Sequence, residues 1–84
     1  MAIRVTRTFE DRRTVLKVDG WLRLGDVEEL TGAYRSVDGP IELDLSELQS
    51  ADQDGMELLR ELIALGVQIR GASPYIELLL RAKS

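Results

Sequence analysis

The sequence predicts a small α/β domain in which a mixed, mostly parallel four-stranded sheet packs against three helices. Segments with apolar residues at every second position alternate with segments whose apolar residues recur at three- and four-residue spacing. Their order is β-β-α-β-α-β-α, and strand–helix–strand units imply parallel strands joined by right-handed crossovers. With 84 residues the chain has room for one domain, which we assign to residues 1–84.

The first part of the chain is predicted to form a hairpin followed by a helix. Residues 3–9 and 14–18 place apolar side chains at alternate positions, and Asp11–Arg13 suits the connection between them. Apolar residues then recur at helical spacing over residues 26–37, behind Asp26 as an N-cap. We therefore expect two paired strands and an amphipathic helix.

The second part contributes two more strands and two more helices. Residues 41–45 and 67–70 alternate as strands, residues 56–65 form an amphipathic helix, and Pro74 opens a third helix at a first-turn position. The residues expected to face the core from the three helices are Val27, Leu30, Tyr34, Val37, Leu59, Leu62, Ile63, Ile76, Leu79 and Leu80.

Polar residues interrupt the predicted strands at regular positions. They are Lys17, Glu42, Asp44, Gln68 and Arg70. Parallel strands that are covered on both faces usually read as continuous apolar runs. We therefore expect the first two helices to cover one face of the sheet, and charged residues to pair across neighbouring strands on a solvated opposite face.

Composition limits the chemistry of this chain. Apolar residues make up 44% and charged residues 31%, which is typical of a globular domain. Neither cysteine nor histidine is present, so disulfides, thiolate nucleophiles, and the commonest general base and zinc ligand are excluded. Most familiar hydrolytic chemistry is therefore excluded. Our expectation is a non-enzymatic protein without a cofactor or a metal.

Charge and hydropathy indicate a cytoplasmic protein. The net charge of −4 argues against nucleic-acid binding. A basic N-terminal cluster, Arg4, Arg7, Arg12 and Arg13, is interpreted as edge-strand charges that discourage aggregation. The N-terminus lacks the apolar segment of a signal peptide, and no apolar run approaches the ~20 residues that cross a bilayer, so we expect no membrane insertion.

Two closely spaced carboxylates lie in the turn Asp52-Gln53-Asp54-Gly55, between a strand and a helix. One interpretation is structural: Asp52 or Asp54 accepts a hydrogen bond from a helix N–H, and Glu57 completes a capping box with Asp54. The helix dipole favours both charges. The other interpretation is that the turn is the functional centre.

The turn and its neighbouring segments resemble a STAS domain, the fold of bacterial anti-sigma factor antagonists. In that family a strand ending in Asp-Leu-Ser is followed by an apolar position and then by Asp-Ser-Ser-Gly or Asp-[Ser/Thr]-x-Gly. Here Asp44–Ser46, Leu48 and Asp52–Gly55 stand at the same spacing. Val18–Leu22 and Gly71–Pro74 add to the resemblance.

The resemblance, which covers about residues 14 to 80, implies a partner-switching protein of transcription regulation. Such a protein binds a serine kinase-like anti-sigma factor through the turn and the helix that follows it. Phosphorylation of the serine before the glycine turns that binding off. The residues implied in partner contact are Asp52, Gln53, Asp54, Gly55 and Met56, with Trp21, Asp26 and Ser73 as secondary candidates on the same edge of the sheet.

The sequence departs from the family at the switch position. Asp54 stands where the serine is expected and Gln53 replaces the other usual serine, so no hydroxyl remains there. A carboxylate imitates a phosphoserine only in part, because the latter carries about −1.5 to −2 charges and three acceptor oxygens. Either the domain is an off-like or differently tuned member of a switching circuit, or it is an accessory subunit of a membrane transporter of the lipid-trafficking ABC type.

Two other functions are less well supported. Residues 54–62 also resemble a helix of a response-regulator receiver, but Asp44 lies further from Gly55 than a receiver's phospho-accepting aspartate does, and the chain is too short for a five-fold βα repeat. Alternatively, Asp44, Asp52 and Asp54 would be oxygen ligands for Mg²⁺. Helix capping explains the same carboxylates without a metal.

For apolar residues at two places, the sequence allows either a buried or an exposed side chain. Trp21 either packs in the core, as large aromatic residues usually do, or is exposed as an anchor for a partner. Leu78, Leu79 and Leu80 give the last helix more apolar surface than one core-facing stripe needs. Either Leu78 or Leu80 is uncovered and supports a homodimer, or the small core packs around them.

Overall fold

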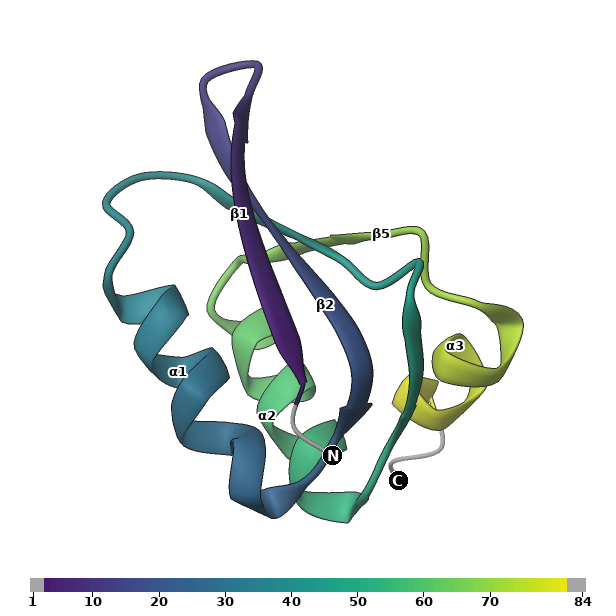
Figure 1. Cartoon of the computed structure of the whole chain (residues 1–84). Coiled ribbons are helices and arrows are strands. Elements are labelled where there is room, and N and C mark those ends of the chain that lie inside the picture. The colour runs from purple at the N-terminus through teal and green to yellow at the C-terminus, as the bar shows by residue number, and fades with distance from the viewer. Residues whose placement is uncertain (1–2, 82–84) are drawn as a thin grey trace.

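A β-hairpin opens the fold, and three α-helices alternate with the remaining strands (Figure 1). The computed structural model describes residues 3–81. The strands are β1 (Arg4–Glu10), β2 (Arg13–Leu22), β3 (Ile41–Asp44), β4 (Leu48–Ala51) and β5 (Gln68–Arg70). The helices are α1 (Val27–Arg35), α2 (Gln53–Ala64) and α3 (Pro74–Arg81), with a 3-10 turn, η1, at Leu24–Asp26. Within residues 3–81, none of the helices has the length and apolar character needed to span a membrane.

The sheet combines one antiparallel pair with parallel pairs. β1 and β2 are antiparallel, whereas β2–β3, β2–β4 and β3–β5 are parallel. The strand order is β1-β2-β3-β5, and β4 pairs with the second half of β2. The predicted fold class, a mixed and mostly parallel sheet with three helices, is confirmed, but the sheet has five strands rather than four.

β4 is the strand that the sequence pattern does not reveal. Its four residues include a single bulky apolar residue, Leu48. β4 lies beside residues 20–22 of β2, which continues beyond its predicted end at residue 18 and is irregular between Gly20 and Trp21. Because a pairing partner distant in the sequence stabilises β4, no local periodicity marks it.

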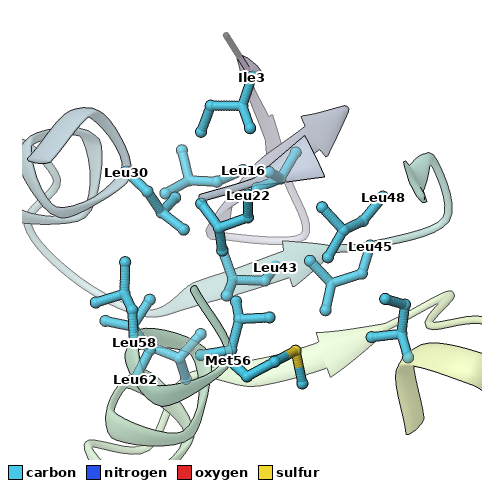
Figure 2. Packing of buried hydrophobic residues seen from close by; sticks show 14 of the residues in the cluster. Ile3, Leu16, Leu22, Leu30, Leu43, Leu45, Leu48, Met56, Leu58 and Leu62 are labelled. Carbon is cyan, nitrogen blue, oxygen red and sulfur yellow. The ribbon is translucent and has the colours of Figure 1, made fainter. Parts of the chain in front are cut away.

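The core lies between one face of the sheet and helices α1 and α2. Figure 2 shows Leu16, Leu22 and Leu43 of the sheet pointing toward Leu30 of α1 and Leu58 of α2. The buried cluster consists of Ile3, Leu16, Val18, Leu22, Leu30, Ile41, Leu43, Leu45, Leu48, Met56, Leu58, Leu59, Leu62, Val67 and Ile76.

One predicted core position on α2 is wrong. Ile63 is 40% exposed, whereas Leu58 is buried. Ile63 lines an open groove together with residues of β5 and α3. Helical spacing identifies a buried stripe, but it does not show how far the neighbouring elements extend over the edge of that stripe.

The opposite face of the sheet is polar, as predicted. Arg70 of β5 lies 3.3 Å from Glu42 and 3.6 Å from Asp44 on β3, and 3.4 Å from Glu10 at the end of β1. Because Glu10 and Arg70 come from opposite ends of the strand order β1-β2-β3-β5, these ion pairs span that part of the sheet. The face is not uniformly solvated, since Val15 of β2 is also buried.

Helix α3 is buried on one side only. Ile76 is fully buried, but Tyr75 and Leu78 are 52% and 65% exposed, while Leu79 and Leu80 are half-buried. Arg60 of α2 donates hydrogen bonds to the carbonyl oxygens of Leu79 and Leu80, at 2.8 and 3.4 Å. Leu78 is therefore uncovered, which is one of the two alternatives predicted for this helix.

Candidate functional site

The site lies where β2 and β4 end side by side. Trp21 pairs with Ser50 and Leu22 pairs with Ala51 in the parallel register, and the Asp52 N–H extends the pairing by donating to the Leu22 carbonyl at 3.0 Å. The loop after β2 and the turn before α2 therefore begin at the same edge of the sheet. Trp21, the next-to-last residue of β2, therefore lies near the turn.

Asp52 is the N-cap of α2 and holds two segments together. Its Oδ1 accepts a hydrogen bond from the Gly55 N–H at 2.8 Å, and its Oδ2 accepts one from the Leu24 N–H at 3.0 Å. The bond from Gly55, followed by the bond from Leu24, holds the pKa of Asp52 below its ordinary value. Of the two carboxylates considered for capping, Asp52 is the one that caps the helix.

Gly55 is required by close packing between α2 and β2. A Cβ atom at this position would lie 2.4 Å from the Leu22 carbonyl oxygen and 2.9 Å from the Leu22 Cγ. Met56, the next residue, is 4% exposed and belongs to the core. Gly55 and Met56, the last two residues of the predicted contact turn, therefore have structural positions. The side chains of Gln53 and Asp54 are exposed, and a partner at this surface would meet them.

Trp21 is exposed beside the turn, so the alternative that placed it in the core is wrong. Its side chain is 49% exposed, and its Nε1 donates to Gln49 Oε1 at 3.1 Å. The Arg23 guanidinium carbon lies 4.9 Å from the centroid of the indole ring, within the range of a cation–π interaction. A hollow of about 230 Å³ lies between the Trp21 side chain and the turn, and it is lined by Trp21, Arg23, Ser50, Ala51 and Asp52.

Three residues that lie next to Trp21 or Asp52 are absent from the site residues predicted from the sequence. Arg23 stacks on the indole, Gln49 accepts its N–H, and Leu24 is 64% exposed next to Asp52. Gln49 belongs to β4, which the sequence pattern does not reveal. Arg23 and Leu24 directly follow the Gly20-Trp21-Leu22 segment, and that proximity is a signal that could have identified them.

Asp26 and Ser73 have structural positions. Asp26 is 8% exposed, and its Oδ2 accepts from the Arg23 N–H at 3.2 Å rather than from a helix N–H. Ser73 begins α3: its Oγ accepts from the Ile76 N–H at 3.2 Å. No hydrogen bond within residues 3–81 joins Ser73 to the Asp52–Gly55 turn. The Asp26 side chain is therefore too buried to add to the exposed surface around Trp21.

Asp44 is engaged apart from the turn. Its Oδ1 accepts from the Ser46 N–H at 2.9 Å, a bond that lowers the pKa of Asp44, and its Oδ2 lies 3.6 Å from Arg70. Across the part of the chain that the structure describes, no group of three or more acidic residues is arranged to hold a metal ion. The geometry thus does not bring Asp44, Asp52 and Asp54 together as the magnesium alternative requires.

Fold and site together define a small α/β domain with an exposed aromatic residue beside a capped helix start. No profile of a known protein family and no curated protein matches the chain. The crystal structure of an antisigma-factor antagonist, a STAS domain from Rhodobacter sphaeroides, matches with a TM-score of 0.62 at 21% identity, over 86% of this chain and 92% of that chain. The chain therefore has the STAS fold, as its motifs imply.

A second solved protein contains a similar fold. A crystal structure of Mglu matches with a TM-score of 0.62 at 25% identity, over 76% of this chain. A structure of Mglu in its L-glutamate binding form matches with a TM-score of 0.55 at 21% identity, over 90% of this chain. The present chain spans only 18% and 27% of those two chains, so the likeness concerns a minor part of Mglu.

Proposed function

We propose that this chain is a non-enzymatic regulatory domain that binds a protein partner in the manner of an anti-sigma factor antagonist. The contact surface consists of Trp21, Arg23, Leu24, Gln53 and Asp54. The observation that carries the proposal is the exposure of Trp21 and Leu24, at 49% and 64%, beside the start of α2. Tryptophan and arginine are enriched among the residues that dominate binding energies.

Asp54 is the carboxylate that this surface offers to a partner. Asp52 already accepts hydrogen bonds at both of its oxygens, whereas Asp54 is exposed in the first turn of α2. Neither residue 53 nor residue 54 carries a hydroxyl, so this turn offers no serine for phosphorylation. The contact is therefore a fixed acidic one, and the domain acts in the cytoplasm of a bacterial cell on a serine kinase-like anti-sigma factor.

A binding titration against the purified kinase-like anti-sigma factor of the same organism tests the proposal. Trp21→Ala is expected to weaken binding by about tenfold or more, because it removes the central aromatic contact. Phe9→Ala is the matched control: Phe9 is 74% exposed but lies at the hairpin turn, far from the Trp21 end of β2. An equal loss of affinity in both variants would contradict the assigned surface.

Asp54→Ser tests the switch position itself. The serine is expected to change the affinity for the kinase-like partner and to become a substrate for its kinase activity, as assayed by phosphate transfer from ATP. If Asp54→Ser does neither, the partner-switching role is wrong. Binding of the wild-type chain to an ABC-transporter subunit, with none to the anti-sigma factor, would assign the same surface to the accessory-subunit alternative.

A further inference from the structure

β1 has a free side that is seven residues long. Within residues 3–81, no strand pairs with the side of β1 that faces away from β2. Val5 is its one partly buried residue, and Phe9 is 74% exposed. The other strands with an unpaired side, β4 and β5, are only four and three residues long. Since unpaired backbone N–H and C=O groups on an edge can template another strand, β1 is the larger candidate for strand addition.

The hairpin geometry determines which backbone groups of β1 are free. Asp11 and Arg12 form a two-residue turn, with φ of 48° and 66°, and Glu10 pairs with Arg13 directly beside it. The residues flanking such a turn exchange both backbone hydrogen bonds, and the pattern alternates along the strands. The residues that bond to β2 are therefore Arg4, Thr6, Thr8 and Glu10. The residues whose backbone groups point to the free side are Val5, Arg7 and Phe9.

A second copy of β1 complements the first when the two strands run antiparallel about a two-fold axis at Arg7. Val5 then lies opposite Phe9, Thr6 opposite Thr8, and Arg4 opposite Glu10. Apolar–aromatic, threonine–threonine and opposite-charge pairs are the cross-strand pairs that stabilise antiparallel sheets. In this register the backbone N–H and C=O groups on the free sides of the two strands form hydrogen bonds, at the pairs Val5–Phe9 and Arg7–Arg7.

Other registers lack this complementarity. A shift of two residues is the smallest that keeps the outward backbone groups paired. In one direction it places Arg4 opposite Thr8, and in the other it places Thr6 opposite Glu10, so the opposite-charge pairs are lost. In the favoured register the like-charged contact is Arg7 with Arg7, and each Arg7 guanidinium is hydrogen-bonded to Ser36 Oγ of its own copy. The edge arginines thus discourage general aggregation and select one pairing.

We propose that two copies of this chain associate through β1, edge to edge and antiparallel, so that one continuous sheet crosses a two-fold axis. Such an interface is isologous, meaning that the same residues contribute from both copies. It uses Val5, Arg7 and Phe9 at the edge, and it leaves the surface around Trp21 open. The dimer interface and the proposed partner contact are therefore separate surfaces.

Charge exchange between the two paired positions tests this interface. Wild-type protein is expected to show a concentration-dependent dimer in sedimentation equilibrium. Arg4→Glu and Glu10→Arg should each weaken it by about tenfold or more, because each turns two attractive pairs into repulsive ones. The double variant Arg4→Glu/Glu10→Arg should restore it, since every pair is again of opposite charge.

Two controls separate the interface from folding and from the other exposed apolar site. Glu10 also forms an ion pair with Arg70, so the unfolding transition of each variant is measured as well. The double variant lacks that ion pair too, yet it is expected to regain the dimer. Leu78→Ser on α3 should leave dimerisation unchanged. A wild-type chain that is monomeric up to about 1 mM, a double variant that stays monomeric, or a dimer lost only in Leu78→Ser would overturn the proposal.

Discussion

Asp52 joins the start of α2 to the loop after β2 through its two carboxylate oxygens. The hydrogen bonds from the Gly55 and Leu24 N–H groups favour the charged carboxylate and so lower its pKa in the folded state. Protonation therefore favours unfolding. The stabilisation is complete above the unfolded-state pKa of about 3.9, and it is lost as the pH falls through the lower folded-state value.

We expect Asp52→Ala to reduce the free energy of unfolding by about 1 kcal/mol at neutral pH, as the loss of an N-cap does. The difference from the wild type should shrink as the pH falls below about 3.9, because the wild-type carboxylate becomes protonated. Urea unfolding over the acid-to-neutral range measures both effects. Asp54→Ala, which removes a charge but no cap, should have a smaller effect. A difference for Asp52→Ala that is constant across this pH range would contradict the assignment.

Gly55 illustrates a residue whose identity depends on packing and not on a contact with a ligand. We expect Gly55→Ala to lower the free energy of unfolding by about 1–3 kcal/mol, because the new Cβ would lie 2.4 Å from the Leu22 carbonyl oxygen and force β2 and α2 apart. Gly32→Ala in α1 is the control: its Cβ meets nothing within 4 Å, and alanine favours a helix by about 1 kcal/mol. Urea unfolding should show opposite signs, and equal signs would reject this explanation.

Among the elements, the β1–β2 hairpin contains the least favourable backbone. Asp11 and Arg12 both have positive φ, 48° and 66°, in a two-residue turn. Turns of this kind favour Asn-Gly or Asp-Gly, because a left-handed conformation costs an ordinary L-residue about 1–2 kcal/mol. The Asp-Arg sequence therefore carries strain at its second position.

We expect Arg12→Gly to raise the free energy of unfolding by about 0.5–1 kcal/mol, since relief of the strain exceeds the extra entropy of glycine in the unfolded chain. Arg13→Gly supplies the matched control, because Arg13 is the first residue of β2 and glycine weakens a strand. Chemical denaturation of the two variants compares them directly. A loss of stability in Arg12→Gly as large as that in Arg13→Gly would show that the turn is not strained.

In the molecule as a whole, α3 completes a core that the first two helices leave open. Ile76 is fully buried within the cluster that joins the sheet to α2, whereas Leu78 of the same helix is 65% exposed. We expect Ile76→Ala to lower the free energy of unfolding by about 2–5 kcal/mol through the cavity that it creates. Leu78→Ala should change it by less than about 0.5 kcal/mol, as exposed positions do. Urea unfolding gives both values, and similar losses would mean that the two positions are buried alike.

Much of this architecture follows from local pattern. Alternation and helical spacing predict the hairpin, the three helices and strands β3 and β5, because these signals reside in neighbouring residues. The polar positions of the strands also predict the solvated face on which Arg70 meets Glu42 and Asp44. The spacing from Asp44–Ser46 to Gly55 likewise indicates the STAS fold, which the solved domain from Rhodobacter sphaeroides shares with this chain.

Tertiary structure alone decides the composition of the site. β4 exists because β2 extends to Leu22 and pairs with it, and this long-range pairing brings Gln49 to Trp21. The sequence determines that Trp21 and Asp54 lie close to the carboxyl edge of the sheet, but exposure depends on what covers each side chain. Residues distant in the chain bury Met56 but leave Trp21 half exposed. Such packing between elements has no local signature in the sequence of the residues that it covers.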